Sequence, residues 1–369
     1  MRLLDRYIFF EWLKAFIMAL AAMIGVLLLE DVQDDMQDYL EWGASSTDIL
    51  LYYLNLLPSF LPLILPIALL ISILFTLGNL HRNSEITAMR AGGLHLFTIT
   101  RSLWLSGGLL ALLLLALNAR VVPESVERSL LMRNNWQMTH FAEVYGSKNT
   151  GNVYHMSFDN QRENRIWFMN RFSDFTYDGF GVNVYERDDE GREVRRLVGD
   201  EAFYDEVAGH WTFVNGREML FDPETGESYN SIGFEEREFP ELTEDPWLMQ
   251  ALNDEPDNLS LNEIQRLLDL SSSENPKLPM YELRQQRILS QPLVCLVMVG
   301  IAVPFAVAGV RVNPVVGVAK ALGLFAVFFA LEEVFRLLGS QGVMPLSLAV
   351  WLPFALMLLV SAHYFRKVV

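Results

Sequence analysis

The amino-acid sequence predicts an α-helical integral membrane protein with six transmembrane helices and an inserted periplasmic all-β, jellyroll-like domain. Of the 369 residues, 51% are hydrophobic and only 20% are charged, whereas a soluble chain has about a quarter charged residues. The apolar residues occur in long stretches, and most of the acidic residues lie in one block between them. These observations together indicate a membrane protein with an acidic domain outside the bilayer.

Six apolar stretches are long enough to cross a membrane, because a hydrocarbon core of about 30 Å requires roughly 20 residues of helix. We expect the first stretch to be a span and not a cleaved signal peptide, since its apolar run is too long and acidic residues follow it. The stretches cover residues 8–30, 50–78, 96–119, 288–310, 315–338 and 343–365.

The Lys and Arg residues of the short loops predict the orientation, because basic loops stay in the cytoplasm. Loops 31–47 and 339–345 contain neither residue type, so we place them outside. With both termini in the cytoplasm, every inside segment is basic and the central acidic block is periplasmic. The basic residues of the inside segments are Arg2, Arg6, Arg82, Arg90, Arg311, Lys320, Arg366 and Lys367.

The acidic block covers residues 121–283, which contain 33 Asp and Glu against 14 Lys and Arg. This shift in composition marks two domain boundaries. We therefore expect three spans in residues 1–120, a periplasmic domain at 121–283, and three more spans in residues 284–369. The net charge of −17 argues against a nucleic-acid partner, which requires clustered Lys and Arg.

Within this block, residues 148–240 have the pattern of an all-β domain. Apolar and polar side chains alternate around Val182, and Asn215-Gly216 is a strong signal for a hairpin turn. Short strands at this spacing suggest a sandwich or a jellyroll. A short helix with a capping box at 260–263 and a linker follow. The domain is either a docking platform or a spacer without a ligand of its own.

The sequence lacks three common catalytic motifs. It has no GxxxxGK[ST] loop for ATP, no HExxH and no GxSxG. The six histidines are scattered, and a single cysteine, Cys295, excludes a disulfide framework and a cysteine-based zinc site. We expect a chain that is not an enzyme and binds no metal or cofactor itself.

The loop between the second and third spans predicts a short cytoplasmic helix near residues 83–91. Asn83 or Ser84 can cap its start, Glu85 suits the positive end of its dipole, and two glycines end it. This helix either docks on a cytoplasmic partner and transmits motion into the membrane, or is an ordinary interfacial turn.

The second span contains three prolines at intervals of four residues, so they lie near one face of the helix. This pattern is typical of a bendable helix that lines a cavity, or of a static kink. The prolines are Pro58, Pro62 and Pro66.

Charged residues occur in the fifth span and at the outer membrane boundary. Glu332, Glu333 and Arg336 either face a cavity or extend to the interface, and Glu332 and Arg336 are expected to pair, one turn apart. Arginines at the outer boundary either bind anionic lipid headgroups or pair with nearby glutamates. These lipid-headgroup candidates are Arg120, Arg128, Arg133, Arg284 and Arg287.

Several short motifs occur along the chain in the order expected for three spans, a β-domain and three spans. The most specific is Ser84 to Gly93, which reads SEITAMRAGG. The others are Leu4 to Ile8, Leu65-Pro66, Thr76 to Gly78, Ala202 to Tyr204, Trp211 with Asn215-Gly216, Pro292, Pro304, Gly309 to Arg311 and Trp351 to Pro353. In this combination the chain resembles the LptF/LptG permease family, the membrane subunits of the lipopolysaccharide export ABC transporter.

The resemblance implies a permease subunit that extracts lipopolysaccharide, or a related glycolipid, from the outer leaflet of the bacterial inner membrane and passes it to a periplasmic bridge. It implies a paralogous permease subunit, a single-span partner and a cytoplasmic ABC ATPase dimer that binds ATP and Mg. The residues that would couple to the ATPase are Ser84, Glu85, Ile86, Met89 and Arg90.

The outer end of the first span departs from the family pattern. Family members commonly place basic residues there, whereas this chain has Glu30-Asp31 and Asp34-Asp35, which would repel an anionic lipid unless divalent cations or nearby arginines compensate. The substrate is then a less phosphorylated glycolipid, or a partner subunit supplies the cations. A periplasmic sensor or assembly scaffold without transport activity would use the same fold, although the cytoplasmic segments contain no output domain.

Overall fold

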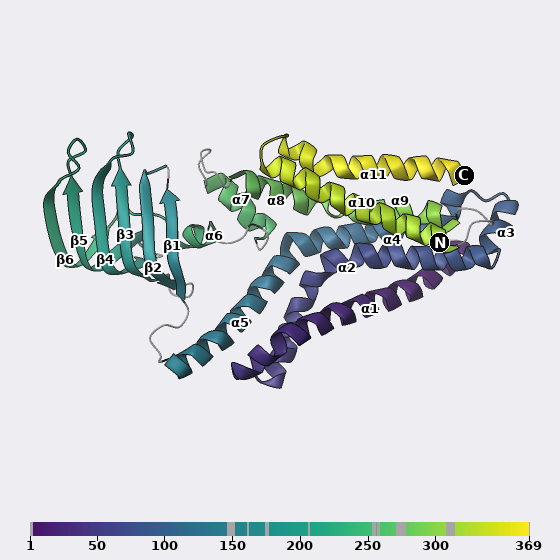
Figure 1. Cartoon of the computed structure of the whole chain (residues 1–369), viewed down its shortest axis with the longest axis horizontal. Helices are drawn as coiled ribbons and strands as arrows, with labels where there is room; N and C mark the ends of the chain where they lie inside the picture. Colours follow the sequence, from purple (N-terminus) through teal and green to yellow (C-terminus); the bar gives the residue numbers. More distant parts are fainter. Residues whose placement is uncertain are drawn as a thin grey trace.

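The computed structural model describes residues 3–145, 152–160, 162–173, 177–205, 207–252, 256, 259–270, 278–307 and 314–368. Long helices form one elongated body, and a six-stranded sheet lies beyond one end of it (Figure 1). Both chain termini and the short helix α3 (Glu85–Ala91) lie at the other end of this body. The fold is therefore mostly helical with an inserted β-sheet.

The described helical elements differ widely in length, from five residues in η1 to 39 residues in α1. They are α1 (Leu3–Glu41), α2 (Ser46–Arg82), α3 (Glu85–Ala91), α4 (Leu96–Ala116), the π-helix η1 (Leu117–Val121), α5 (Val122–Tyr145), α6 (Pro246–Ala251), α7 (Leu261–Leu270), α8 (Leu278–Ser290), α9 (Leu293–Val307), α10 (Pro314–Ser340) and α11 (Leu346–Val368).

Among the described residues, four helical segments are long and apolar enough to cross a membrane: α1, α2, the continuous helix Leu96–Gln137 and α11. The pair α8 and α9, bent by 49° at a break, adds a fifth if it is counted as one span. The remaining predicted span falls on α10, which contains the charged residues Lys320, Glu332 and Glu333 and is not one of these segments. The prediction of a multi-span helical protein is confirmed, and the count of six spans is not.

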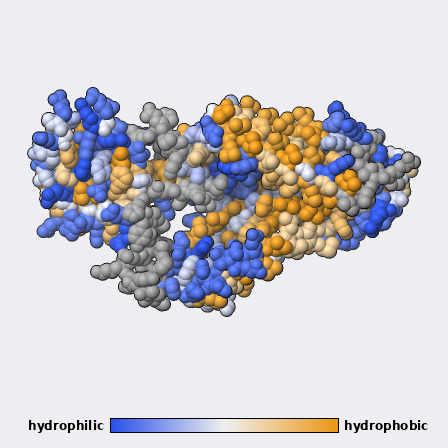
Figure 2. Space-filling model, viewed as in Figure 1, coloured by the Kyte–Doolittle hydropathy of each residue, from blue (hydrophilic) through white to orange (hydrophobic). Residues whose placement is uncertain are grey.

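The surface of the helical body has the polarity that a bilayer requires. On the viewed face, hydrophobic side chains cover its middle, while hydrophilic ones lie near α3 and over the sheet (Figure 2). Large apolar side chains such as Leu109, Leu112 and Leu359 are about 70% exposed, far more than a water-facing surface of this size favours. This band is the surface that lipid would cover.

The centre of the helical body is α9, which packs against α2, α4, α10 and α11. Nearly all of its side chains are buried, including Val297, Val299 and Val303. Close approach of the neighbouring helices depends on glycine: a Cβ on Gly107 of α4 would lie 2.6 Å from Val299 Cγ2. The same helix carries Gly108, beside which a Cβ would meet nothing within 4 Å.

This pair of glycines gives a matched test of the packing. Gly107→Ala is expected to lower the free energy of unfolding by about 1–3 kcal/mol, because overpacking a core costs that much. Gly108→Ala should be neutral or stabilising by up to about 1 kcal/mol, the gain in helix propensity. Thermal unfolding in detergent measures both, and equal effects of the two substitutions would contradict the close contact between α4 and α9.

The inserted domain is one antiparallel sheet in which each strand pairs with the next along the chain. The described strands therefore form a meander in a single sheet, whereas a jellyroll has two packed sheets, and the jellyroll-like arrangement is not confirmed. The strands are β1 (Asn152–Asn160), β2 (Arg165–Ser173), β3 (Gly179–Arg187), β4 (Glu193–Asp205), β5 (His210–Phe221) and β6 (Ser228–Phe239).

A separate hydrophobic core holds this sheet together. Alternate side chains of the strands, among them Trp167, Val182 and Phe213, are fully or almost fully buried on one face. The chain after β6 completes this core, because Leu242 and Met249 of α6 are 0% exposed and belong to the same cluster. The segment from Leu242 to α6 thus closes the apolar face of the sheet.

The hairpin turn predicted at Asn215-Gly216 is wrong. These residues lie inside β5, where Gly216 pairs with Gly199 of β4 and Phe234 of β6. Asn215 has a φ of 48°, a value that asparagine tolerates well. A Cβ on Gly216 would lie 2.7 Å from the Val198 carbonyl oxygen, so the glycine is needed for close strand packing and not for a turn.

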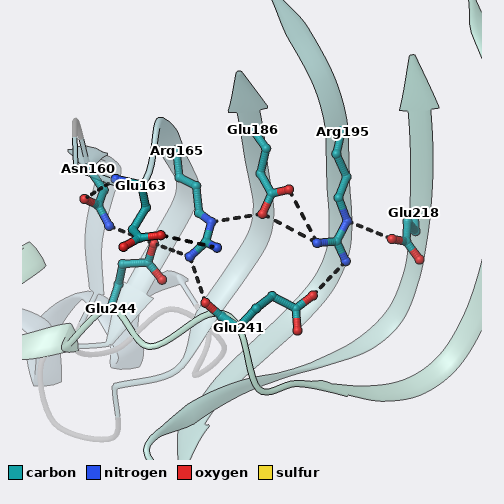
Figure 3. Close-up of polar contacts among 8 residues, drawn as sticks. All are labelled: Asn160, Glu163, Arg165, Glu186, Arg195, Glu218, Glu241 and Glu244. Atoms are coloured by element: carbon teal, nitrogen blue, oxygen red, sulfur yellow. Dashed lines mark hydrogen bonds and ion pairs between the residues drawn. The ribbon is translucent and has the colours of Figure 1, made fainter. Parts of the chain in front are cut away.

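Arginines and glutamates alternate across neighbouring strands and tie the segment after β6 to the sheet (Figure 3). Arg165 Nε lies 2.9 Å from Glu186 Oε1, and Arg195 Nε lies 2.7 Å from Glu218 Oε1. Arg195 also donates to Glu241 at 2.9 Å. Burial alone would raise the pKa of Glu241, but hydrogen bonds from its own backbone N–H and from Arg195 lower it below its ordinary value.

Candidate functional site

A cavity of about 290 Å³ opens between α2, α4, η1, α8, α9 and α10, in the part of the helical body nearer the sheet. Apolar side chains such as Leu114, Val294 and Phe329 line one part of it. Charged and polar side chains line the rest, and these are Ser59, Asn118, Arg287, Gln291, Glu332, Glu333 and Arg336.

Three helices that line the cavity have irregular backbones at this level. Pro62 and Pro66 of α2 face it, while Pro58 is not one of its lining residues. Asn118 belongs to the π-helix η1, and Gln291 lies at the break between α8 and α9. Asn118 Nδ2 donates to Gln291 Oε1 at 2.9 Å, joining two irregular points that are 173 residues apart. Irregular backbone at membrane depth is typical of cavity linings.

The charged residues predicted in the fifth span do line this cavity. Arg336 donates two hydrogen bonds to Glu333, one of 2.8 Å from Nε, so the pairing expected with Glu332 is wrong in its partner. Glu333 and Arg336 are three residues apart on α10, which is also a contact spacing on a helix. Arg287 of α8 interacts electrostatically with Glu332 and Glu333. Two cationic and two anionic side chains therefore meet in the cavity.

The other arginine candidates lie outside this cavity. Arg120 pairs with Glu124 at 2.7 Å, and Arg128 lies 3.8 Å from the same carboxylate. Both arginines remain more than 60% exposed. Arg284 is half-buried on α8 and is not a lining residue. Of the five lipid-headgroup candidates, the structure brings only Arg287 into the charged cavity.

The acidic C-terminal end of α1 has two different faces. Asp35 accepts a hydrogen bond from Tyr39 at 3.1 Å and lies 3.8 Å from Arg133 of α5, next to a buried aromatic cluster around Tyr52. These contacts hold the C-terminal end of α1 against α2 and α5. The opposite face is exposed and carries Glu30, Asp34, Asp38 and Glu41.

At the other end of the helical body, α3 forms the short helix that was predicted near residues 83–91. Ile86 is 0% exposed and belongs to the hydrophobic cluster at the centre of the helical body, which we call the main core. Met89 packs partly against this core, whereas Ser84 and Arg90 are exposed. Ser84 occupies the N-cap position, but its φ of 63° is left-handed and its side chain makes no capping hydrogen bond. The predicted side-chain cap is therefore wrong, because α2 continues to Arg82 and the chain must turn sharply before α3.

Two polar contacts fix the first turn of α1 beside α3 and α4. Arg101 of α4 donates two hydrogen bonds to Asp5, whose carboxylate is almost fully buried. Tyr7 donates its hydroxyl to Glu85 Oε2 at 3.0 Å. The role of Arg101 was not predicted, although a lone arginine near the start of an apolar span was the available signal.

The comparison with known families covers nearly the whole chain. The family model described as "Lipopolysaccharide export system permease LptF/LptG" matches residues 6–367. The chain belongs to the LptF/LptG family. The resemblance found in the sequence is thereby confirmed. Among curated proteins, none matches the chain.

As an LptF/LptG permease, the chain is a transport subunit for lipopolysaccharide export in general terms. Its several long apolar helices fit an inner-membrane protein, and its sheet fits a periplasmic domain. The LptF/LptG chain thus presents two regions with polar side chains in defined positions, the charged cavity near the sheet and the α3 end of the helical body.

Proposed function

We propose that this chain is the permease subunit of an ABC transporter that extracts lipopolysaccharide, or a related glycolipid, from the outer leaflet of the inner membrane. It passes the lipid to a periplasmic bridge while a separate ATPase supplies the energy. The family match over residues 6–367 carries this proposal. The placement of the cavity near the sheet and of α3 at the opposite end supports it.

The size of the cavity supports pairing with a second, paralogous permease subunit. A volume of about 290 Å³ is at the lower limit even for drug-sized ligands. A lipid with several acyl chains is much larger, and each buried CH₂ contributes about 0.8 kcal/mol to its retention in the bilayer. Extraction therefore requires a larger apolar chamber, to which each of two permease chains contributes one wall.

The charge of the cavity bears on the headgroup. Arg287 is the cationic side chain that we assign to an anionic headgroup, because it lies at the predicted outer membrane boundary and lines the cavity. The acidic residues Asp31 and Asp35 at the outer end of α1 are partly buried and interact with Tyr53, Tyr39 and Arg133. Their charges are thus partly compensated within the chain. These two carboxylates therefore repel an anionic lipid less strongly than the sequence alone suggested.

At the α3 end, we propose contact with a cytoplasmic ABC ATPase dimer that binds ATP and Mg. Ser84, Glu85 and Arg90 are accessible for this contact. Ile86 and Met89, by contrast, pack against the main core and attach α3 to the rest of the helical body. The proposal places both termini and α3 in the cytoplasm and the sheet in the periplasm. It includes a single-span partner and six membrane spans, with α10 as the fifth.

The proposal is tested by reconstituting this chain with its paralogous subunit and the ATPase in proteoliposomes that contain lipopolysaccharide. We expect ATP-dependent transfer of lipid to a soluble periplasmic acceptor, measured by photocrosslinking. A variant of the ATPase that binds but does not hydrolyse ATP is the control. Absence of ATP-dependent transfer in a complex that hydrolyses ATP would overturn the proposed function and favour a scaffold without transport activity.

A further inference from the structure

The hydrogen bond between Tyr7 and Glu85 connects two elements that are 78 residues apart in the sequence. The Tyr7 hydroxyl on α1 donates to Glu85 Oε2 on α3 with a distance of 3.0 Å. Tyr7 is 43% exposed and Glu85 is partly exposed, so both lie at the surface of the α3 end. The contact fixes one oxygen of the Glu85 carboxylate at this partly exposed position.

The first turns of α1 provide a rigid support for Tyr7. Asp5 is held by two hydrogen bonds from Arg101 of α4. Ile8 and Trp12 are buried in the main core, and Trp12 Nε1 donates to Ser72 Oγ of α2 at 3.0 Å. Tyr7 lies between these fixed residues and therefore has little freedom to move relative to α2 and α4.

By contrast, α3 has little local support of its own. Seven residues are far fewer than an isolated helix needs in water. Its N-cap residue, Ser84, provides no side-chain hydrogen bond, and Ile86 is its buried anchor. Glu85 immediately follows this strained cap. The direction of its carboxylate therefore depends on a contact from outside α3, and Tyr7 provides it.

We propose that Tyr7 is a positioning residue, whose hydroxyl holds the Glu85 carboxylate in the orientation that meets a cationic side chain of the ATPase. This inference rests on the proposed function, because the ATPase is its partner. Tyr7 does not touch ATP or lipid and acts through Glu85. Fixing a charged side chain before binding removes part of the ordering cost of the complex.

The test measures the affinity of the ATPase for the assembled permease pair in nanodiscs. Tyr7→Phe removes only the hydroxyl and is expected to weaken binding by up to about tenfold, the cost of ordering one free side chain on binding. Glu85→Gln should weaken binding further. The double variant should bind as weakly as Glu85→Gln alone, because Tyr7 acts only through the carboxylate.

Tyr364→Phe is the matched control. Tyr364 lies near the end of α11 at the same end of the helical body and is 37% exposed, and its contacts with Phe305 and His363 are between rings. This variant is expected to bind the ATPase like the unmodified chain. If Tyr7→Phe lowers the melting temperature of the permease, Glu85→Asp replaces it, since the shorter side chain keeps its charge but withdraws from Tyr7.

Each outcome separates the inference from the proposed function. If the unmodified permease binds no ATPase, the proposed function fails. If it binds and Tyr7→Phe binds equally well, the positioning role is overturned while the proposed function stands. If Tyr7→Phe weakens binding by the same factor in the Glu85→Gln background, Tyr7 acts independently of the carboxylate and the inference is again overturned.

Discussion

Trp211→Ala is expected to lower the free energy of unfolding of the β-domain by about 3–5 kcal/mol, the usual cost of truncating a large buried aromatic side chain. Trp211 is 0% exposed, and its ring lies 5.1 Å from that of Trp167. Its backbone N–H donates to Leu242 O at 3.1 Å, and Nε1 donates to Glu244 O at 2.8 Å. The substitution therefore removes core volume and one bond to the segment after β6.

Proteolysis of the full-length protein at increasing urea concentrations measures this effect. Trp211→Phe should be intermediate, because it keeps most of the ring volume and loses the Nε1 hydrogen bond, which is worth about 1 kcal/mol. Tyr229→Ala is the control, since Tyr229 on β6 is 68% exposed and surface substitutions stay within about 0.5 kcal/mol. Equal stability of Trp211→Ala and Tyr229→Ala would show that Trp211 is not part of the core.

Ile86→Asp is expected to detach α3 and to abolish binding of the ATPase to the permease. Ile86 is 0% exposed in the main core, and an unpaired carboxylate in an apolar site costs several kcal/mol. Seven residues cannot remain helical without this anchor. Co-purification of the ATPase measures the loss, and hydrogen exchange in residues 85–91 measures the detachment.

Thr87→Asp is the control for this experiment, because the neighbouring Thr87 is exposed and the added charge is the same. The permease with Thr87→Asp should keep α3 protected from exchange. Retained binding in the Ile86→Asp variant would contradict a contact between α3 and the ATPase. Loss of protection in both variants would contradict the role of Ile86 as the anchor.

The sequence predicted a helical protein with several long apolar helices and an inserted sheet, because both depend on local composition. A run of about 20 apolar residues has few alternatives to a membrane helix. The acidic block at 121–283 contains none of the six predicted stretches, so its strands were expected outside the membrane. The break between α8 and α9 and the π-helix at Asn118 were not predicted. Their positions depend on contacts between distant helices, such as the bond from Asn118 to Gln291, which local patterns do not encode.

The candidate site was predicted in its residue types but only partly in its contacts. Glu332, Glu333 and Arg336 all line the cavity. This agrees with one of the two predicted alternatives, in which these residues face a cavity and do not extend to the membrane interface. The choice of Glu333 over Glu332 as the partner of Arg336 depends on the side-chain positions on α10, since both spacings allow a pair. The hairpin turn predicted at Asn215-Gly216 was wrong for a similar reason. Strand pairing on both sides of β5 overrides the local turn preference of these two residues.

The buried position of α9 has a consequence for how the protein is made. The faces of α2 and α4 that it covers emerge from the ribosome about 200 residues earlier, yet their apolar partner is in the last part of the chain. Until α9 is inserted, Gly107 and its neighbours face lipid or a chaperone in place of Val299. A nascent chain arrested before residue 293 would therefore be a substrate for membrane quality-control proteases, however well its sheet has folded.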